Sequence, residues 1–170
     1  MTNNNITPFQ YIFDRFLSKI TDDLYLELTE EDTKRDMEGI LVNSISGFEF
    51  PRFPLFNYSV SNRGEQGRYN VLLSHEEVDI ISDLMVLEWT KRQIASVENT
   101  RMKYSGSDFK FTSQANHLDK LIRLKREMEN GSKHKQRLYK RRKVDNSSGA
   151  VTTNWSGMAG GVISGTRNEI

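Results

Sequence analysis

The fold is decided by residues 74–99, which read SHEEVDIISDLMVLEWTKRQIASVEN. Ser74 with Glu77 three residues later is a capping box, a pattern that opens a helix. The apolar residues that follow fall on nearly every side of that helix: Val78, Ile80, Ile81, Leu84, Met85, Val86, Leu87, Trp89, Ile94 and Val97. A helix of this kind must be covered by other elements over most of its surface. We therefore predict a central helix that begins after Ser74 and ends near Asn99.

Two further helices are expected before the central one. The first has Thr7 as its N-cap and Pro8 as its first residue, because proline is favoured at that position. Its apolar positions form one stripe: Phe9, Ile12, Phe13, Phe16, Leu17 and Ile20. The second helix begins at Thr29, which acidic residues follow, and ends near Ser46, just before Gly47. Its buried stripe is predicted to be Met37, Ile40, Leu41 and Ile45.

The segments that join these helices are predicted to be short or extended. Residues 22–28 fit either a turn of helix or a brief strand. Residues 48–58 contain two prolines, which exclude a regular helix, and are too aromatic for a solvated loop. We expect that segment to press against the helices or against a neighbouring subunit. Residues 56–60 and 68–72 are predicted to pair as a small hairpin.

A fourth helix is expected over residues 112–130, with Gly131 as its terminator. Residues 132–144 then form a basic segment. Residues 145–170, rich in Ser, Gly, Thr and Asn, form an extended C-terminal arm that orders only on a partner. The predicted fold is mainly α: a helical bundle of about four helices in domain 1–131, which includes the aromatic segment and a small β-hairpin insertion at 48–73. Its core is expected to include Phe9, Ile12, Phe13, Phe16, Leu84, Met85 and Trp89.

The formal net charge of +1 conceals an asymmetry along the chain. Residues 1–50 hold ten acidic and four basic side chains, a net charge of −6. Residues 120–143 hold eleven basic and two acidic side chains, a net charge of +9. Opposite charges at its two ends allow a chain to bind an acidic partner with one end and to dock on neighbours with the other.

Composition also limits the setting in which the protein works. The chain has no cysteine, which excludes disulfides and thiolate metal sites. Neither a signal peptide nor an apolar run of membrane-spanning length is evident. We therefore expect a soluble protein that is made inside a cell.

No set of residues in the sequence points to catalysis. The histidines His75, His117 and His134 lack the spacing of metal ligands. Acidic pairs such as Glu76-Glu77 stand at helix starts, where capping and the helix dipole account for them. There is no P-loop, dinucleotide fingerprint or nucleophile elbow. We expect no catalytic residue, no metal and no cofactor, and the enzymatic alternative is a nuclease that uses the acidic pairs with Mg²⁺.

One basic run has a functional interpretation, which is contact with nucleic-acid phosphates. The run consists of Lys133, Lys135, Arg137, Lys140, Arg141, Arg142 and Lys143. Such contact is independent of base sequence and weakens as salt is added. The alternative is a solvated flank, or a surface that meets an acidic subunit such as the first fifty residues of another copy.

The arm 145–170 also has two interpretations, a dispensable end or a docking arm that folds on a partner. Trp155 would anchor a docking arm, because a tryptophan in a polar tail has no other evident role. The candidate docking residues are Trp155, Met158, Val162 and Ile163.

Several stretches carry a resemblance to a known family. They are FQYIFD at 9–14, LSHEEVDII at 73–81, LMVLEW at 84–89, QIASVEN at 93–99 and MKYSGSDFK at 102–110. In this order they resemble the head–tail adaptor proteins of tailed bacteriophages, also called connector, head-completion or neck proteins. The resemblance covers about residues 8–144 and contains no catalytic motif, and the arm after Asp145 has no counterpart.

The resemblance implies a structural virion protein, made in the host cytoplasm, that joins head to tail as a homo-oligomeric ring of about twelve copies. It implies three partners besides the neighbouring copies: the portal protein, the next neck or tail-completion protein, and viral DNA that passes through the channel. It also implies that the arm grips the portal and that the basic run lies near the portal or lines the channel. The leading alternative is a small helical DNA-binding or regulatory protein that uses the run 133–143.

Overall fold

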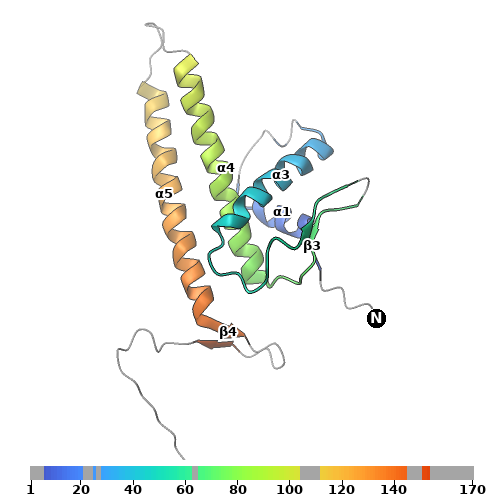
Figure 1. Ribbon diagram of the computed structural model, residues 1–170. Helices are drawn as coiled ribbons and strands as arrows, with labels where there is room; N and C mark the ends of the chain where they lie inside the picture. Colours follow the sequence, from blue (N-terminus) through green and yellow to red (C-terminus); the bar gives the residue numbers. More distant parts are fainter. Residues whose placement is uncertain are drawn as a thin grey trace, which may run out of the picture. The chain divides into compact units, whose positions relative to one another are not determined.

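A computed structural model describes residues 6–20, 25, 28–62, 65–103, 112–144 and 151–153 (Figure 1). The main helices within these residues are α1 (Phe9–Leu17), α3 (Glu30–Ser44), α4 (His75–Lys103) and α5 (Thr112–Arg141). A short 3-10 helix, η1 (Ile45–Gly47), continues α3. The chain divides into two units, residues 1–136 and residues 137–170. The predicted mainly α class with a small β insertion is confirmed.

Helix α4 is the element against which α1 and α3 pack (Figure 1). Its capping box forms as predicted: Ser74 Oγ accepts from the backbone N–H of Glu77 (3.3 Å), and Glu77 Oε2 accepts from that of Ser74 (2.7 Å). The first half of α4 is buried on several sides, at Val78, Ile80, Ile81, Leu84, Met85, Val86 and Leu87. Trp89 is half-buried, and after Thr90 the described side chains are half-buried or exposed. The helix ends at Lys103, beyond the predicted end near Asn99.

Helix α1 buries its predicted stripe, with Phe9, Ile12, Phe13 and Phe16 inside. The predicted cap was wrong, because Pro8 precedes the helix and its side chain makes no capping hydrogen bond. Thr7 is used differently. Its Oγ1 donates to the carbonyl of Val71 (3.0 Å) and accepts from the N–H of Leu73 (2.8 Å). The hydroxyl therefore ties the N-terminal strand to the segment that leads into α4.

The first unit also contains a small antiparallel sheet. Its strands are β1 (Thr7–Pro8), β2 (Tyr58–Ser59) and β3 (Arg68–Tyr69), in the order β1-β3-β2. The predicted hairpin is present in a shorter form, with Tyr58 opposite Tyr69, whereas strand β1 was not predicted. Phe9 packs its ring against that of Tyr69 (centroids 5.2 Å apart), and its N–H donates to the carbonyl of Gly67 (2.9 Å).

Helix α3 begins and ends close to where its sequence predicts. Thr29 is the N-cap and accepts from the N–H of Asp32 (3.2 Å), and the helical backbone of η1 ends at Gly47. The predicted stripe is buried, with Met37, Ile40 and Leu41 in α3 and Ile45 in η1. Residues 48–58 are not helical, as predicted, but only part of the segment is buried: Leu55 is inside, while Phe56 is 78% exposed. The segment 22–28 falls largely outside the described residues.

Helix α5 does not end at Gly131, so that prediction was wrong. The helix continues for ten further residues because the next turns are held by contacts. Ser132 and Gln136 are buried, and Lys135 is paired with two carboxylates of α4. These contacts outweigh the weak helix propensity of a single glycine.

The second unit contains the end of α5 and a two-stranded hairpin. Strand β4 (Arg142–Val144) pairs antiparallel with β5 (Val151–Thr153), with Arg142 opposite Thr153. This hairpin was not predicted, since residues 132–144 were assigned to a basic segment and residues 145–170 to an arm. The remainder of that arm lies outside the described residues.

Candidate nucleic-acid interface

Three cations lie on the solvent side of α5: Arg123, Arg126 and Lys133, hereafter the basic face. All three are exposed, and none of them takes part in an ion pair within the described residues. At 100° and 1.5 Å per residue, they fall within roughly 80° of one another over roughly 15 Å of helix axis. The exposed carboxylates near this face are Glu127 beside it and Asp119 one turn before Arg123, whereas Glu129 is neutralised by Lys125 (3.3 Å).

The orientation of the basic face follows from the side of α5 that packs inward. Gln136 is the clearest anchor on that side, with only 1% of its surface exposed. Its Oε1 accepts from the N–H of Glu49 (2.7 Å), and its Nε2 donates to the carbonyl of Gly47 (3.1 Å) and to Ser132 Oγ (3.2 Å). Because a buried amide needs every one of these partners, α5 cannot rotate about its axis without losing them.

An ion cluster fastens α5 and α1 to α4. Lys135 of α5 pairs with Asp79 and with Asp83 (2.6 Å to the latter). Lys19, just after α1, pairs with the same two carboxylates at 2.8 and 2.5 Å. Arg15 of α1 adds a third cation on Asp79 at 2.8 Å. Three cations therefore share two carboxylates of α4.

The charges in this cluster are mutually stabilised. Partial burial alone would raise the pKa of Asp79, but hydrogen bonds from Lys135, Lys19 and Arg15 outweigh it and hold that pKa far below its ordinary value. Partial burial likewise opposes the charged form of Lys135, and its hydrogen bonds to Asp79 and Asp83 reverse this and raise its pKa. Asp79 is therefore ionised and Lys135 protonated at neutral pH.

The structure separates the predicted basic run into different environments. Lys133 is exposed on the basic face. Lys135 is predicted to face DNA or the portal, and its ammonium group is bound by Asp79 and Asp83, which competes with any contact to phosphates. Lys143 belongs to β4.

In the second unit four of the predicted basic residues are exposed. Arg137, Lys140 and Arg141 lie on the last turn and a half of α5, and Arg142 begins β4. Exposure is compatible with phosphate contact by this unit as well. The four candidate residues of the docking arm, Trp155, Met158, Val162 and Ile163, lie outside the described residues.

Sequence reasoning missed Arg123 and Arg126 as members of a shared face with Lys133. The signal was present, since both contribute to the net charge of +9 over residues 120–143. Because Gly131 predicts the end of the helix, the sequence alone does not place Arg126 and Lys133 on one helical surface. Once α5 is continuous across Gly131, residues on both sides of it share one helical surface.

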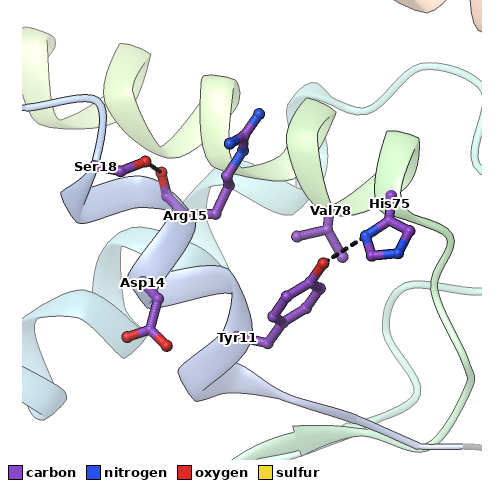
Figure 2. A pocket seen from close by; sticks show the side chains of 6 residues that line it. All are labelled: Tyr11, Asp14, Arg15, Ser18, His75 and Val78. Atoms are coloured by element: carbon purple, nitrogen blue, oxygen red, sulfur yellow. Dashed lines mark hydrogen bonds between the residues drawn. The ribbon is translucent and has the colours of Figure 1, made fainter.

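An open pocket of about 510 Å³ lies where α1 meets the start of α4 (Figure 2). The hydroxyl of Tyr11 is hydrogen-bonded to Nδ1 of His75 at 2.5 Å, and the two rings meet edge to face. Asp14 accepts from Gln10 Nε2 (2.8 Å), and Ser18 Oγ donates to the carbonyl of Arg15 (2.8 Å). These polar groups are hydrogen-bonded within the protein, and the bond between Tyr11 and His75 connects α1 to α4. They present no evident reactive arrangement.

Within the described residues, no cluster of three or more His, Cys, Asp or Glu side chains is placed to hold a metal ion. None of the helices in those residues has the length and apolarity needed to cross a membrane.

Comparison with known proteins finds no match to any protein family, to any characterised protein or to any solved structure.

Proposed function

We propose that the chain is a structural virion protein that forms a homo-oligomeric ring between the portal and the tail or neck of a tailed bacteriophage, with the basic face of α5 toward the DNA channel. The observation that carries the proposal is the basic face itself. Three cations without an ion pair among the described residues share one side of a helix that Gln136 and Lys135 hold in place, so they form a fixed, positively charged surface. A surface of this kind suits DNA that must slide past it, because phosphate contacts do not depend on base sequence.

Exposed apolar side chains support a role in assembly. Phe56, Leu72 and Val60, all in or beside the β2–β3 hairpin, are 78%, 59% and 52% exposed. Large apolar side chains left exposed on one segment are candidates for a protein–protein contact site. In the proposed ring they meet neighbouring copies, the portal or the next neck component.

The basic face makes a quantitative prediction for DNA binding. If its three cations each contact one phosphate of duplex DNA, they contribute about −2.7 to the slope of log K against log salt concentration. That slope corresponds to a loss of affinity of about 40-fold between 50 and 200 mM salt. The triple variant Arg123→Gln, Arg126→Gln, Lys133→Gln should lose this contribution and retain its fold, because none of the three side chains is buried.

The matched control removes three cations from elsewhere on the surface. Lys34→Gln, Arg35→Gln and Lys91→Gln break only surface ion pairs with residues of their own helix, so folding should change little. This control should keep the salt slope of the unmodified protein. Fluorescence anisotropy with a labelled duplex, at several salt concentrations, measures both variants.

The ring is tested separately by native mass spectrometry of the full chain, alone and with portal protein. A closed oligomer, formed alone or on the portal, supports the proposal. A stable monomer or dimer that ignores the portal but binds duplex DNA would instead favour a small DNA-binding or regulatory protein. A protein that neither assembles nor binds DNA would overturn both.

A further inference from the structure

Helix α5 is attached to the rest of the first unit mainly by polar contacts. Among the side chains of α5 that the structure describes in this unit, Leu118 is the only apolar one that is buried. Met128, which contacts Thr90 of α4 (Sδ to Oγ1, 3.7 Å), is half-buried. The other buried side chains of α5 in this unit, Ser132 and Gln136, are polar. Because apolar burial is the main term that holds helices in a fold, the attachment of α5 depends on hydrogen bonds and ion pairs.

The other helices of the first unit have an apolar core of their own. Helix α1 buries Phe9, Ile12, Phe13 and Phe16, and both α1 and α3 pack against α4. These contacts do not involve α5. We therefore expect α1, α3 and α4 to stay folded together when α5 leaves.

The ion cluster is divided between the two oxygens of each carboxylate. The Oδ1 atoms bind the cations of the α1 side: Arg15 on Asp79 (2.8 Å), and Lys19 on Asp79 (2.8 Å) and Asp83 (2.5 Å). The Oδ2 atoms of both aspartates bind Lys135 of α5, with 2.6 Å to that of Asp83. Two cations on the α1 side already match two carboxylates in charge, so Lys135 is the third. The cluster therefore stays neutral, with every Oδ1 contact intact, when Lys135 leaves.

Solvent reaches the contacts that hold α5. The side chains of Lys135, Asp83 and Asp79 are 32%, 31% and 23% exposed. Salt screens such partly open pairs, since the Debye length falls from about 10 Å at 0.1 M to about 3 Å at 1 M. The N–H and carbonyl groups that Gln136 satisfies would meet water once α5 has left, so no polar group there would stay buried without a partner.

We infer that α5 is a releasable helix: competition for the ammonium group of Lys135, by salt or by the phosphates of duplex DNA, detaches α5 from α4 while α1, α3 and α4 stay folded. Release by salt goes beyond the proposed function and does not depend on it. Release by DNA rests on the proposed binding of DNA to α5.

Duplex DNA favours the released helix because that form offers one more cation. The docked helix presents the three cations of the basic face, whereas Lys135 lies about 160° away from Lys133 and is bound to α4. On the released helix Lys135 becomes the fourth cation, and four phosphate contacts correspond to a salt slope of about −3.6. A ligand that binds one state more tightly shifts the population toward that state. DNA should therefore raise the fraction of released α5.

Single-molecule fluorescence energy transfer within one chain tests the release. The chain contains no cysteine, so two dyes can be placed by Asn43→Cys in α3 and Leu124→Cys in α5. Both positions are exposed. Leu124 lies at least about 100° around the helix from each cation of the basic face, so its dye leaves that face open to DNA.

The labelled chain should show one population at 0.1 M NaCl and a second, with lower transfer efficiency, that grows toward 1 M NaCl. Lys135→Gln should raise the ratio of released to docked chains at 0.1 M NaCl about tenfold, because it removes hydrogen bonds between charged groups. The matched control is Lys125→Gln, which removes a cation of α5 whose partner Glu129 lies on the same helix. The control should change the ratio less than about twofold.

Two further measurements distinguish release from unfolding. Far-UV circular dichroism should change little between 0.1 and 1 M NaCl, and amide exchange in α1 should stay slow. A single population that persists at 1 M NaCl in both the unmodified chain and Lys135→Gln overturns the inference. Loss of protection in α1 together with release also overturns it, because α5 would then be part of one cooperative unit.

Duplex DNA added at 0.1 M NaCl should raise the released fraction of the unmodified chain. DNA that binds without doing so overturns the coupling of DNA to release. The salt measurements need neither DNA nor portal protein. A chain that neither assembles nor binds DNA, yet releases α5 in salt, therefore overturns the proposed function and supports the releasable helix.

Discussion

Replacing Gln136 by methionine should lower the free energy of unfolding by about 2–4 kcal/mol, a magnitude that follows from the partners it loses. The two side chains have similar length, so the change removes hydrogen bonds while it keeps most of the volume. It leaves the N–H of Glu49 and the carbonyl of Gly47 without their side-chain partner. Leaving one buried group without its partner costs about 1–3 kcal/mol. Both of these groups are only partly buried, so we expect the two costs together to be about 2–4 kcal/mol.

The measurement is urea unfolding followed by far-UV circular dichroism, with Gln66→Met as the control. Gln66 is exposed, so the same chemical change there should alter the free energy of unfolding by less than about 0.5 kcal/mol. Hydrogen exchange adds a local readout, because weaker docking of α5 should speed exchange in that helix before the rest of the first unit opens. If Gln136→Met and Gln66→Met unfold at the same urea concentration, Gln136 does not anchor α5 and the orientation of the basic face loses its support.

Three further predictions concern single positions. Gly67→Ala should destabilise the protein by about 1–3 kcal/mol, because the new Cβ would lie 2.4 Å from Cδ2 of Phe9. Gly131→Ala has open space and should stabilise α5 by up to about 1 kcal/mol. Thermal unfolding of the two variants checks that the first melts below the unmodified protein and the second above it. Tyr69→Phe should raise the melting temperature slightly, since the buried Tyr69 hydroxyl has no hydrogen-bond partner among the described residues, and a lower melting temperature would reveal a partner. Asp79 has a lowered pKa in the folded protein, so its stabilisation is fully present above the ordinary carboxyl pKa of about 3.9 and is lost as pH falls below it. Asp79→Asn should therefore be less stable at neutral pH and show a flatter fall in melting temperature below about pH 4, and an unchanged acid profile would remove Asp79 from the cluster's stabilising role.

Local signals in the sequence were sufficient for several helix starts. Ser74 with Glu77, and Thr29 before its acidic residues, each make the capping hydrogen bonds that their spacing predicts. Such bonds join residues three positions apart and need no contact from elsewhere in the chain. The apolar stripes of α1 and α3 could also be predicted locally, because the helical period alone places them on one side of each helix.

The misread positions are those whose partners lie far along the chain. The hydroxyl of Thr7 satisfies Val71 and Leu73 instead of capping α1, because the formation of strand β1 brings that segment within reach. Glycine at position 131 favours the end of a helix, but contacts of the following turns with η1 and α4 keep the backbone helical.

The candidate site, too, is predicted in part by the sequence and decided in part by the tertiary structure. Charge density over residues 120–143 is a property of the sequence, and it alone predicts that this part of the chain meets something acidic. Which cations are available was decided by the tertiary structure. Lys133 and Lys135 are two residues apart and chemically identical, yet one faces solvent and the other is bound by Asp79 and Asp83. The physical reason is that positions two apart on a helix point about 160° away from each other, so the side of α5 that packs on α4 takes one lysine and leaves the other free for a partner.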